Sequence, residues 1–244
     1  MSMRSLLLLS LGVPALLAEA PQPSAQEILA KAKAAMGGAA WDRVTHIAWK
    51  GSLATSGLKG SLEALECVRD GRSVSRFDLG VTKGAEGFDG KVSWSQDGTG
   101  DVRAEPAENP AGMNYMKTYA FWFPKRCKAA IRHLGLREGH FHVLEIKPKG
   151  AETFELWVNG QTWMLDRTVT GLGAKPSTTF FQDYREVSGV KLPFRILTPK
   201  EDRTQDTRIE FTAVAVNGAL PNQAFARPEL RLSDFGIEGT AGSA

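Results

Sequence analysis

The sequence predicts a mainly β protein of the α+β class, with one large curved antiparallel sheet. We expect an unclosed β-barrel of about a dozen strands whose concave face is covered by helices. Three observations predict it. Apolar residues alternate with period two from His46 onward. Most predicted strands are joined by turns of a few residues, such as Asp70-Gly71 and Asn159-Gly160, which favours antiparallel pairing. Helical spacing is confined to residues 24–36 and 109–123.

The strands are predicted from alternating segments between Gly-containing turns. They cover residues 46–54, 58–69, 72–79, 81–88, 91–96, 101–104, 129–137, 140–147, 152–158, 163–170, 178–186, 190–197 and 207–216. In the first, Ile47, Trp49, Gly51 and Leu53 share a face. In the last, strict alternation places Ile209, Phe211, Ala213 and Ala215 on one side.

Two stretches are predicted to be helical. Residues 24–36 begin with the capping-box sequence Ser24-Ala-Gln-Glu27 and end at Gly37-Gly38. Residues 109–123 begin at Asn109-Pro110, end before Pro124, and carry apolar side chains on most sides. This second segment is too short to span a membrane. Two interpretations stay open: a core helix packed on the sheet, or a lid that touches an apolar ligand.

Composition favours one domain without nucleic-acid binding. The chain has 244 residues, 42% of them hydrophobic, and a net charge of +3 with no basic run. Residues 1–20 have the charged start, apolar core and small residues of a signal peptide, with cleavage after Ala18 or Ala20. No cysteine lies near this site, so we expect a periplasmic or secreted protein without a lipid anchor. Residues 21–226 would form the domain, and residues 227–244 a polar tail.

Motifs for catalysis or metal binding are weak. The chain has no Gly-x-Ser-x-Gly elbow and no His-Glu-x-x-His helix, so we expect no enzymatic activity and no cofactor. His140 and His142 share a strand face and could hold a metal with a third ligand, but two histidines at the polar rim of a sheet explain them as well. Cys67 and Cys127 could form a disulfide or stay as buried thiols.

Three stretches together resemble the LolA/LolB-like superfamily of periplasmic lipoprotein carriers. They are Ile28-Leu-Ala-Lys-Ala-Lys-Ala-Ala-Met-Gly-Gly38, Gly87-Phe-Asp-Gly-Lys-Val-Ser-Trp94 and Asp183-Tyr-Arg-Glu-Val-Ser-Gly-Val-Lys-Leu-Pro-Phe194. The second is also similar to the region that precedes some secreted retropepsin-like proteases. The resemblance implies an unclosed barrel capped by helices, and transport or sensing of lipoproteins or lipids. No single functional residue of the carrier family can be matched to a position in this chain.

A carrier of acyl chains needs a large apolar cavity and a movable cover, because each buried methylene contributes roughly 0.8 kcal/mol. Our candidates for the concave face are Trp49, Leu62, Phe77, Trp94, Phe154 and Phe211, and for the cover Met113, Met116, Tyr119 and Phe123. Expected partners are lipid or lipoprotein acyl chains and a membrane-bound donor or acceptor protein. The alternative is a protein-interaction or lipid-sensing module, related to the protease-associated region and without its own catalysis.

Overall fold

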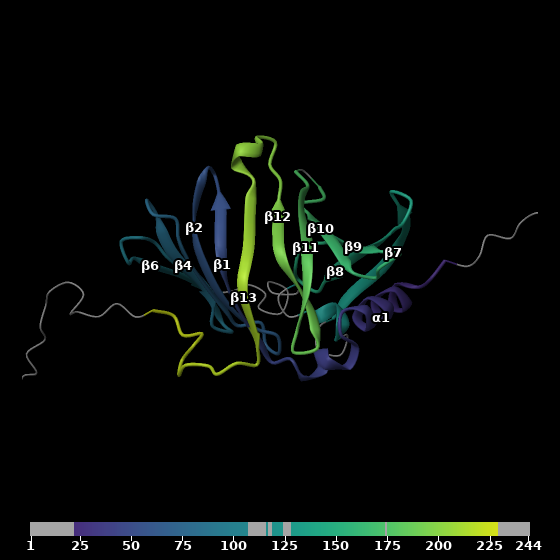
Figure 1. The fold of residues 1–244 in the computed structure, drawn as a ribbon, viewed down its shortest axis with the longest axis horizontal. Helices are drawn as coiled ribbons and strands as arrows, with labels where there is room; N and C mark the ends of the chain where they lie inside the picture. The colour runs from purple at the N-terminus through teal and green to yellow at the C-terminus, as the bar shows by residue number, and fades with distance from the viewer. Residues whose placement is uncertain (1–21, 107–115, 117–118, 124–127, 174, 229–244) are drawn as a thin grey trace, which may run out of the picture.

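The computed structural model of the protein describes residues 22–106, 116, 119–123, 128–173 and 175–228. Thirteen antiparallel strands form a single sheet (Figure 1). They are β1 (His46–Thr55), β2 (Leu58–Cys67), β3 (Ser73–Asp78), β4 (Lys83–Phe88), β5 (Val92–Gln96), β6 (Val102–Pro106), β7 (Ala129–Arg137), β8 (Phe141–Pro148), β9 (Phe154–Asn159), β10 (Leu165–Thr170), β11 (Ser177–Val187), β12 (Val190–Thr198) and β13 (Thr207–Val216). The predicted fold class is confirmed.

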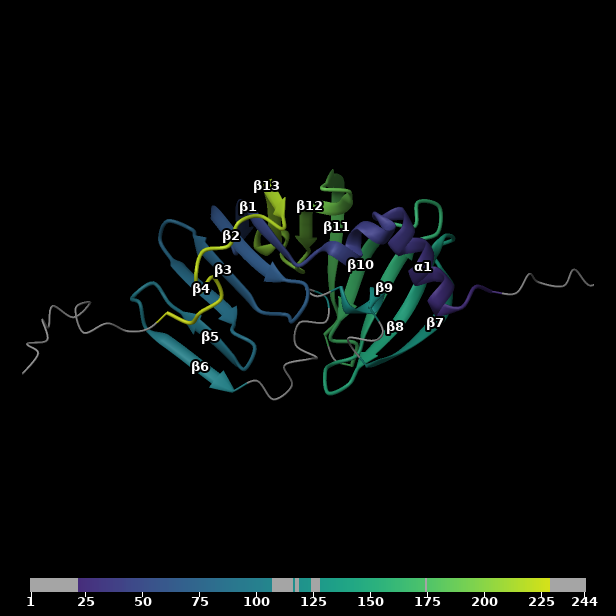
Figure 2. The ribbon, with the colours of Figure 1, turned by 90° about the horizontal axis from the view of Figure 1, so that it is seen from below.

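The sheet consists of two meanders that join where β1 pairs with β13. The strand order runs β6-β5-β4-β3-β2-β1-β13-β12-β11-β10-β9-β8-β7, so every neighbouring pair except β1 and β13 is also consecutive in the chain. Figure 2 shows the resulting two wings, β1–β6 on one side and β7–β11 on the other. The end strands β6 and β7 do not pair with each other, so the barrel stays open.

The helix predicted from the capping box is present as α1 (Ala25–Ala35). The Ser24 hydroxyl accepts a hydrogen bond from the Glu27 N–H at 3.2 Å, and the Glu27 carboxylate accepts one from the Ser24 N–H at 2.7 Å. Ile28, Leu29 and Ala32 are its buried residues. The helix lies over strands β7–β10 of the second wing (Figure 2), so it covers the concave face on that side. Within the described residues, no helix is long and apolar enough to cross a membrane.

Glycine ends this helix because a side chain would not fit there. Gly37 has φ +125°, and a Cβ at this position would lie 2.5 Å from the carbonyl oxygen of Gly189. The close approach lets Lys191 N–H donate to the Met36 carbonyl at 2.9 Å, which joins the helix end to the β11–β12 hairpin. A 3-10 segment, η1 (Gly38–Arg43), then leads into β1.

The predicted helix over residues 109–123 is wrong at its C-terminal end. Residues 107–115, 117–118 and 124–127 lie outside the described part of the chain. The described residues of this segment are 116 and 119–123, and among them the structure has only a short 3-10 turn, η2 (Ala120–Trp122). Tyr119 is left-handed, with φ +49°, and this conformation interrupts an α-helix. A continuous helix through Phe123 is therefore excluded. The aromatic residues after the break pack inward instead of following one helical face.

The face assignment of β13 is also wrong for its second half. Lys50 pairs with Ala213 while Gly51 pairs with Phe211, so Thr212 is an extra residue in a β-bulge. The bulge reverses the alternation, and Val214, not Ala213, follows Phe211 on the core side. Gly51 is required opposite the bulge, because a Cβ there would lie 2.2 Å from the Glu210 carbonyl oxygen.

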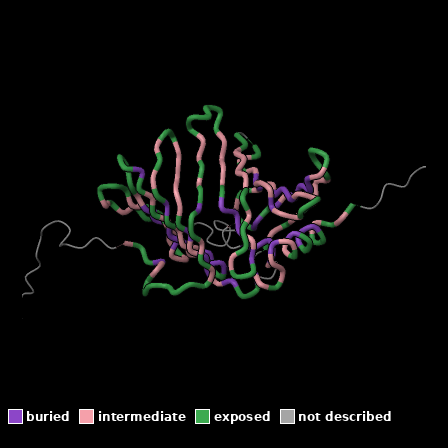
Figure 3. The backbone as a smooth tube through the Cα atoms, viewed as in Figure 1, coloured by how far each residue is buried: buried purple, intermediate pink, exposed green. Residues whose placement is uncertain are grey.

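The main core is formed where α1, η1 and η2 meet the concave side of the sheet. Figure 3 shows buried positions toward one end of the central strands, whereas the opposite ends of β1, β2, β12 and β13 are half-buried or exposed. A second cluster lies on the other face of the β1–β6 wing and contains Cys67, Val74, Ala85, Trp94 and Phe225. Cys67 is a buried free thiol. Cys127, its partner in the disulfide alternative, lies outside the described residues.

Candidate ligand cavity

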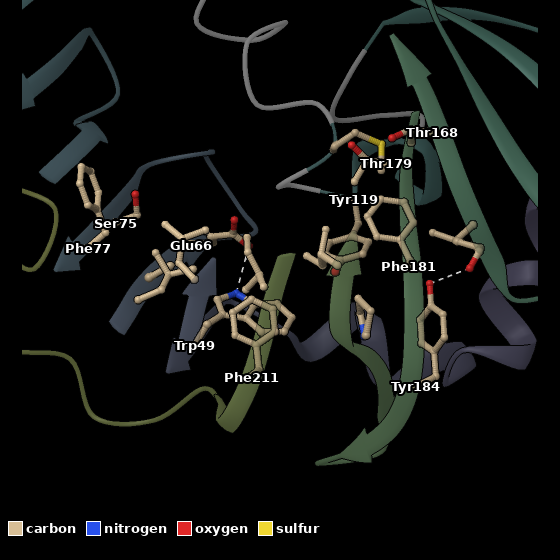
Figure 4. A pocket seen from close by; sticks show the side chains of 18 of the residues that line it. Trp49, Glu66, Ser75, Phe77, Tyr119, Thr168, Thr179, Phe181, Tyr184 and Phe211 are labelled. Carbon is tan, nitrogen blue, oxygen red and sulfur yellow. Dashed lines mark hydrogen bonds between the residues drawn. The ribbon is translucent and has the colours of Figure 1, made fainter. Parts of the chain in front are cut away.

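A cavity of about 520 Å³ lies on the concave face, between the two wings (Figure 4). Most of its walls are apolar. The lining residues are Met36, Trp49, Leu53, Leu62, Ala64, Glu66, Ser75, Phe77, Glu86, Met116, Tyr119, Leu165, Thr168, Thr179, Phe181, Tyr184, Pro193, Ile196, Ile209 and Phe211. A cavity of this size and lining is typical of sites for small apolar molecules.

Strand register builds the first wall. Trp49 of β1 pairs with Ala64 of β2, Ala64 pairs with Ser75 of β3, and Ser75 pairs with Glu86 of β4. Directly paired residues point to the same face of a sheet, so this row runs from an indole ring to a carboxylate across the cavity wall. The Trp49 ring also packs on Phe211 of β13, with 4.6 Å between ring centroids.

A break in the β11–β12 ladder builds the second wall. Gln182 pairs with Arg195 and Tyr184 with Pro193, but Asp183, at φ +54°, does not pair with Phe194 between them, and the register is the same on both sides of this break. Phe181 and Tyr184, three residues apart, both line the cavity, as do their partners Ile196 and Pro193. The Tyr184 hydroxyl donates to the Leu165 carbonyl at 2.8 Å, and burial raises the pKa of Tyr184 well above its usual range. This tyrosine is a neutral part of the wall.

An aromatic cluster closes the end of the cavity next to α1. Tyr119 is stacked on Trp122, with centroids 5.3 Å apart, and both rings contact Trp41, at 4.4 Å from Tyr119 and 4.6 Å from Trp122. Trp41 is fully buried and donates from Nε1 to the Met36 carbonyl at 2.8 Å. Burial, and secondarily the charge of Glu66, raises the pKa of Tyr119 above its usual range. The cluster fixes Tyr119 against the cavity.

The structure brings six of the ten predicted site residues together at this cavity. They are Trp49, Leu62, Phe77, Met116, Tyr119 and Phe211. Phe154 is buried in the main core and does not line the cavity, and the ring of Phe123 lies under Lys33 Nζ at 4.9 Å. Met113 lies outside the described residues.

The prediction that Trp94 lies on the concave face is wrong. Glu86 pairs with Ser95, so Ser95 shares the cavity face and the neighbouring Trp94 points to the other side. There it packs with Phe225, which the chain brings back across the outer surface after β13. No local feature of β5 distinguishes its two faces, because the covering segment is distant in sequence.

Sequence reasoning missed the second wall and two polar residues. Phe181 and Tyr184 do not follow period two, so their common face depends on the left-handed conformation of Asp183 between them. Glu66 is half-buried and accepts a hydrogen bond from Trp49 Nε1 at 3.1 Å. Glu86 is exposed at the same wall, where the Ser75 hydroxyl donates to it at 3.4 Å.

The histidines form a pair that sequence spacing did not indicate. His142 Nδ1 lies 3.3 Å from His133 Nε2, and His133 Nδ1 lies 2.9 Å from the Pro23 carbonyl oxygen. Because a carbonyl only accepts, His133 donates to Pro23 and accepts from His142. His140 instead contacts Phe141. No group of three or more His, Cys, Asp or Glu side chains suited to a metal occurs within the described residues.

The histidine pair predicts a loss of stability in mild acid. Burial, followed by the charges of His133 and Lys31, lowers the pKa of His142 from 6.5. Above pH 6.5 both folded and unfolded states are neutral at this site. Below it the unfolded chain binds the proton first, so the free energy of unfolding falls until the pH passes the folded pKa. Urea midpoints measured from pH 7.5 to 5 are expected to fall less in His142→Gln than in the unsubstituted protein; equal slopes would contradict this.

The sequence matches no protein-family model and no curated protein. Several solved structures, however, share the arrangement. A LolA superfamily protein from Nitrosomonas europaea has a TM-score of 0.57 at 13% identity, covering 84% of this chain and 99% of its own. This chain has the LolA-like fold. A DUF1329 family protein from Desulfovibrio piger has a TM-score of 0.57 at 15% identity, covering 82% and 96%.

A third similar structure comes from Vibrio parahaemolyticus and is named for outer membrane lipoprotein sorting. It has a TM-score of 0.54 at 15% identity and covers 82% of this chain and 94% of its own. At such low identity, the likeness concerns the fold. The LolA-like resemblance predicted from the sequence is confirmed at that level.

Proposed function

We propose that this protein is a non-enzymatic carrier that binds lipid or lipoprotein acyl chains in the periplasm or outside the cell. The observation that carries the proposal is the apolar cavity of about 520 Å³ on the open face of the sheet. Burying ten methylenes there would contribute roughly 8 kcal/mol. That gain offsets the similar cost of withdrawing the same methylenes from a bilayer, so an acyl chain can pass from a membrane into the cavity with little net change in free energy.

The supporting features are of three kinds. The cavity is bordered by Met116, whose flexible thioether adapts to chains of different length and bend. The LolA-like structure from Vibrio parahaemolyticus is named for lipoprotein sorting. Residues 1–20 have the pattern of a signal peptide. In this proposal, residues 21–226 are the carrier domain, residues 227–244 a tail, and a membrane-bound protein donates or accepts the ligand.

Native mass spectrometry and dye uptake test the proposal. The protein, purified from membranes, is expected to carry bound lipid and, after delipidation, to enhance the fluorescence of the neutral apolar dye Nile red in a saturable way. Dodecyl maltoside below its micelle concentration is expected to displace the dye. A protein that purifies without lipid and takes up neither compound would contradict the proposal and would favour an interaction module.

A substitution at Met116 distinguishes a role in ligand binding from a role in folding. Asp at this position places a charge on the cavity wall, and a bound chain would have to remove water from that charge, which is unfavourable. Met116→Asp is expected to weaken dodecyl maltoside binding about tenfold, while the free energy of unfolding changes by less than about 1 kcal/mol because Met116 is only half-buried. Dye displacement and urea unfolding measure the two quantities. A parallel loss of both would mean that this residue serves only the core.

A further inference from the structure

One wall of the cavity is acidic, although the cavity as a whole is apolar. Glu66 of β2 and Glu86 of β4 both line it, with Ser75 of β3 between their strands. None of the described lining residues is Lys, Arg or His. Figure 4 shows Glu66 and Ser75 on the same wall, opposite Phe181 and Tyr184.

Register sets the spacing of these polar groups. Ser75 pairs directly with Glu86, so their Cβ atoms lie about 5 Å apart, whereas Glu66 is diagonal to Ser75 at about 7–8 Å. A headgroup placed over Ser75 would therefore lie beside the Glu86 carboxylate and close enough to the Glu66 carboxylate to interact with its charge. Trp49 Nε1 holds the Glu66 carboxylate at 3.1 Å, which fixes its position at the wall.

The negative charge acts across the cavity. The Glu66 charge contributes to the raised pKa of Tyr119, which belongs to the aromatic cluster at the other side. Apolar walls weaken solvent screening, so a charged group inside the cavity experiences these carboxylates more strongly than it would at an open surface. The headgroup of a ligand is thus selected by its charge, and a carboxylate headgroup is disfavoured.

We propose that the cavity binds amphiphiles whose chain ends in a primary ammonium group. The ammonium group lies over Ser75, next to Glu86 and facing Glu66, and the chain lies along Trp49, Phe211 and the other apolar residues. This inference rests on the proposed function, because it names the class of amphiphile that the same cavity takes. Ammonium groups of this kind occur in aminophospholipids and at the free α-amino end of lipidated polypeptides.

Competition with Nile red tests the headgroup preference. Three ligands with the same chain length are compared at pH 7 below their micelle concentrations: dodecylammonium, dodecyl maltoside and laurate. We expect dodecylammonium to bind at least about tenfold more tightly than laurate. In Glu66→Gln/Glu86→Gln the preference for dodecylammonium over laurate is expected to fall below about twofold.

A charge-matched double variant serves as the control. Glu63 and Glu210 pair with Lys50 and Arg195 and lie on strands that also line the cavity, but both point to the opposite face. Glu63→Gln/Glu210→Gln removes the same charge and is expected to keep the ammonium preference. Loss of the preference in this control would mean that net charge, not the acidic wall, controls binding, and would overturn the proposal.

The remaining outcomes separate this inference from the proposed function. If dodecyl maltoside fails to displace the dye, the carrier function is wrong. If maltoside binds but ammonium and carboxylate headgroups bind equally, only the headgroup inference is wrong. Two further probes then identify which natural molecule supplies the ammonium group. They are lyso-phosphatidylethanolamine and an S-palmitoylated cysteinyl peptide, each measured with and without N-acetylation. The natural class is the one whose affinity falls on acetylation. If neither falls, the inference is overturned.

Discussion

Replacing Trp41 with alanine is expected to lower the free energy of unfolding by about 3–5 kcal/mol. The side chain is fully buried, and its removal leaves a cavity among Tyr119, Trp122 and the end of α1. It also leaves the Met36 carbonyl without the hydrogen bond from Trp41 Nε1. Equilibrium urea unfolding, followed by circular dichroism, measures the change.

The matched control is Trp163→Ala. Trp163 is half-buried and contacts His142 and Lys31 of α1, so we expect a loss of about 1 kcal/mol. Trp41→Phe is expected to fall between the two, because it keeps a ring but loses the donor. If Trp41→Ala costs no more than Trp163→Ala, the aromatic cluster does not hold α1 and Tyr119 in place.

Filling the cavity is expected to abolish ligand binding without unfolding the protein. Ala64 lies in the row between Trp49 and Ser75, half-buried on the cavity wall. An indole ring at this position occupies space that a chain would otherwise fill. We expect Ala64→Trp to weaken dodecyl maltoside binding at least about 30-fold, with a change of less than about 1.5 kcal/mol in the free energy of unfolding.

The control for this variant is Ala213→Trp. Ala213 is exposed and lies after the bulge in β13, on the opposite face from Phe211. It receives the same added volume but is expected to leave affinity within about twofold. Undiminished binding in Ala64→Trp would place the ligand somewhere other than this cavity. Calorimetric titration of both variants decides between these results.

Local signals in the chain predict much of the fold. Asp70-Gly71 and Asn159-Gly160 mark tight turns, and the capping box at Ser24 marks the start of α1. Consecutive strands joined in this way pair as antiparallel neighbours, which accounts for eleven of the twelve strand pairs in the sheet order. Four of the cavity-lining residues, Trp49, Leu62, Phe77 and Phe211, follow from the same alternation, because period two separates the two faces of a strand.

The errors arise where a distant contact or an extra residue changes a local pattern. Thr212 is a single-residue bulge that reverses the alternation beyond it, and the left-handed Asp183 interrupts the alternation of β11 without a register shift. Tyr119 is left-handed where the sequence predicts a helix, because its ring packs on Trp41, 78 positions earlier in the chain. Trp94 faces outward because Phe225 covers it there.

The pairing of β1 with β13 has no local signal, yet it closes the two meanders into one curved sheet. It brings Phe211 onto Trp49 and so completes the first wall of the cavity. Turn chemistry and alternation act over a few residues, which is why the strands, α1 and the apolar composition of the concave face can be read from the chain. The cavity depends on the pairing of β1 with β13, two strands that the chain separates widely, and its acidic wall depends on the register of the neighbouring strands β2, β3 and β4. Both are set by packing in the folded state.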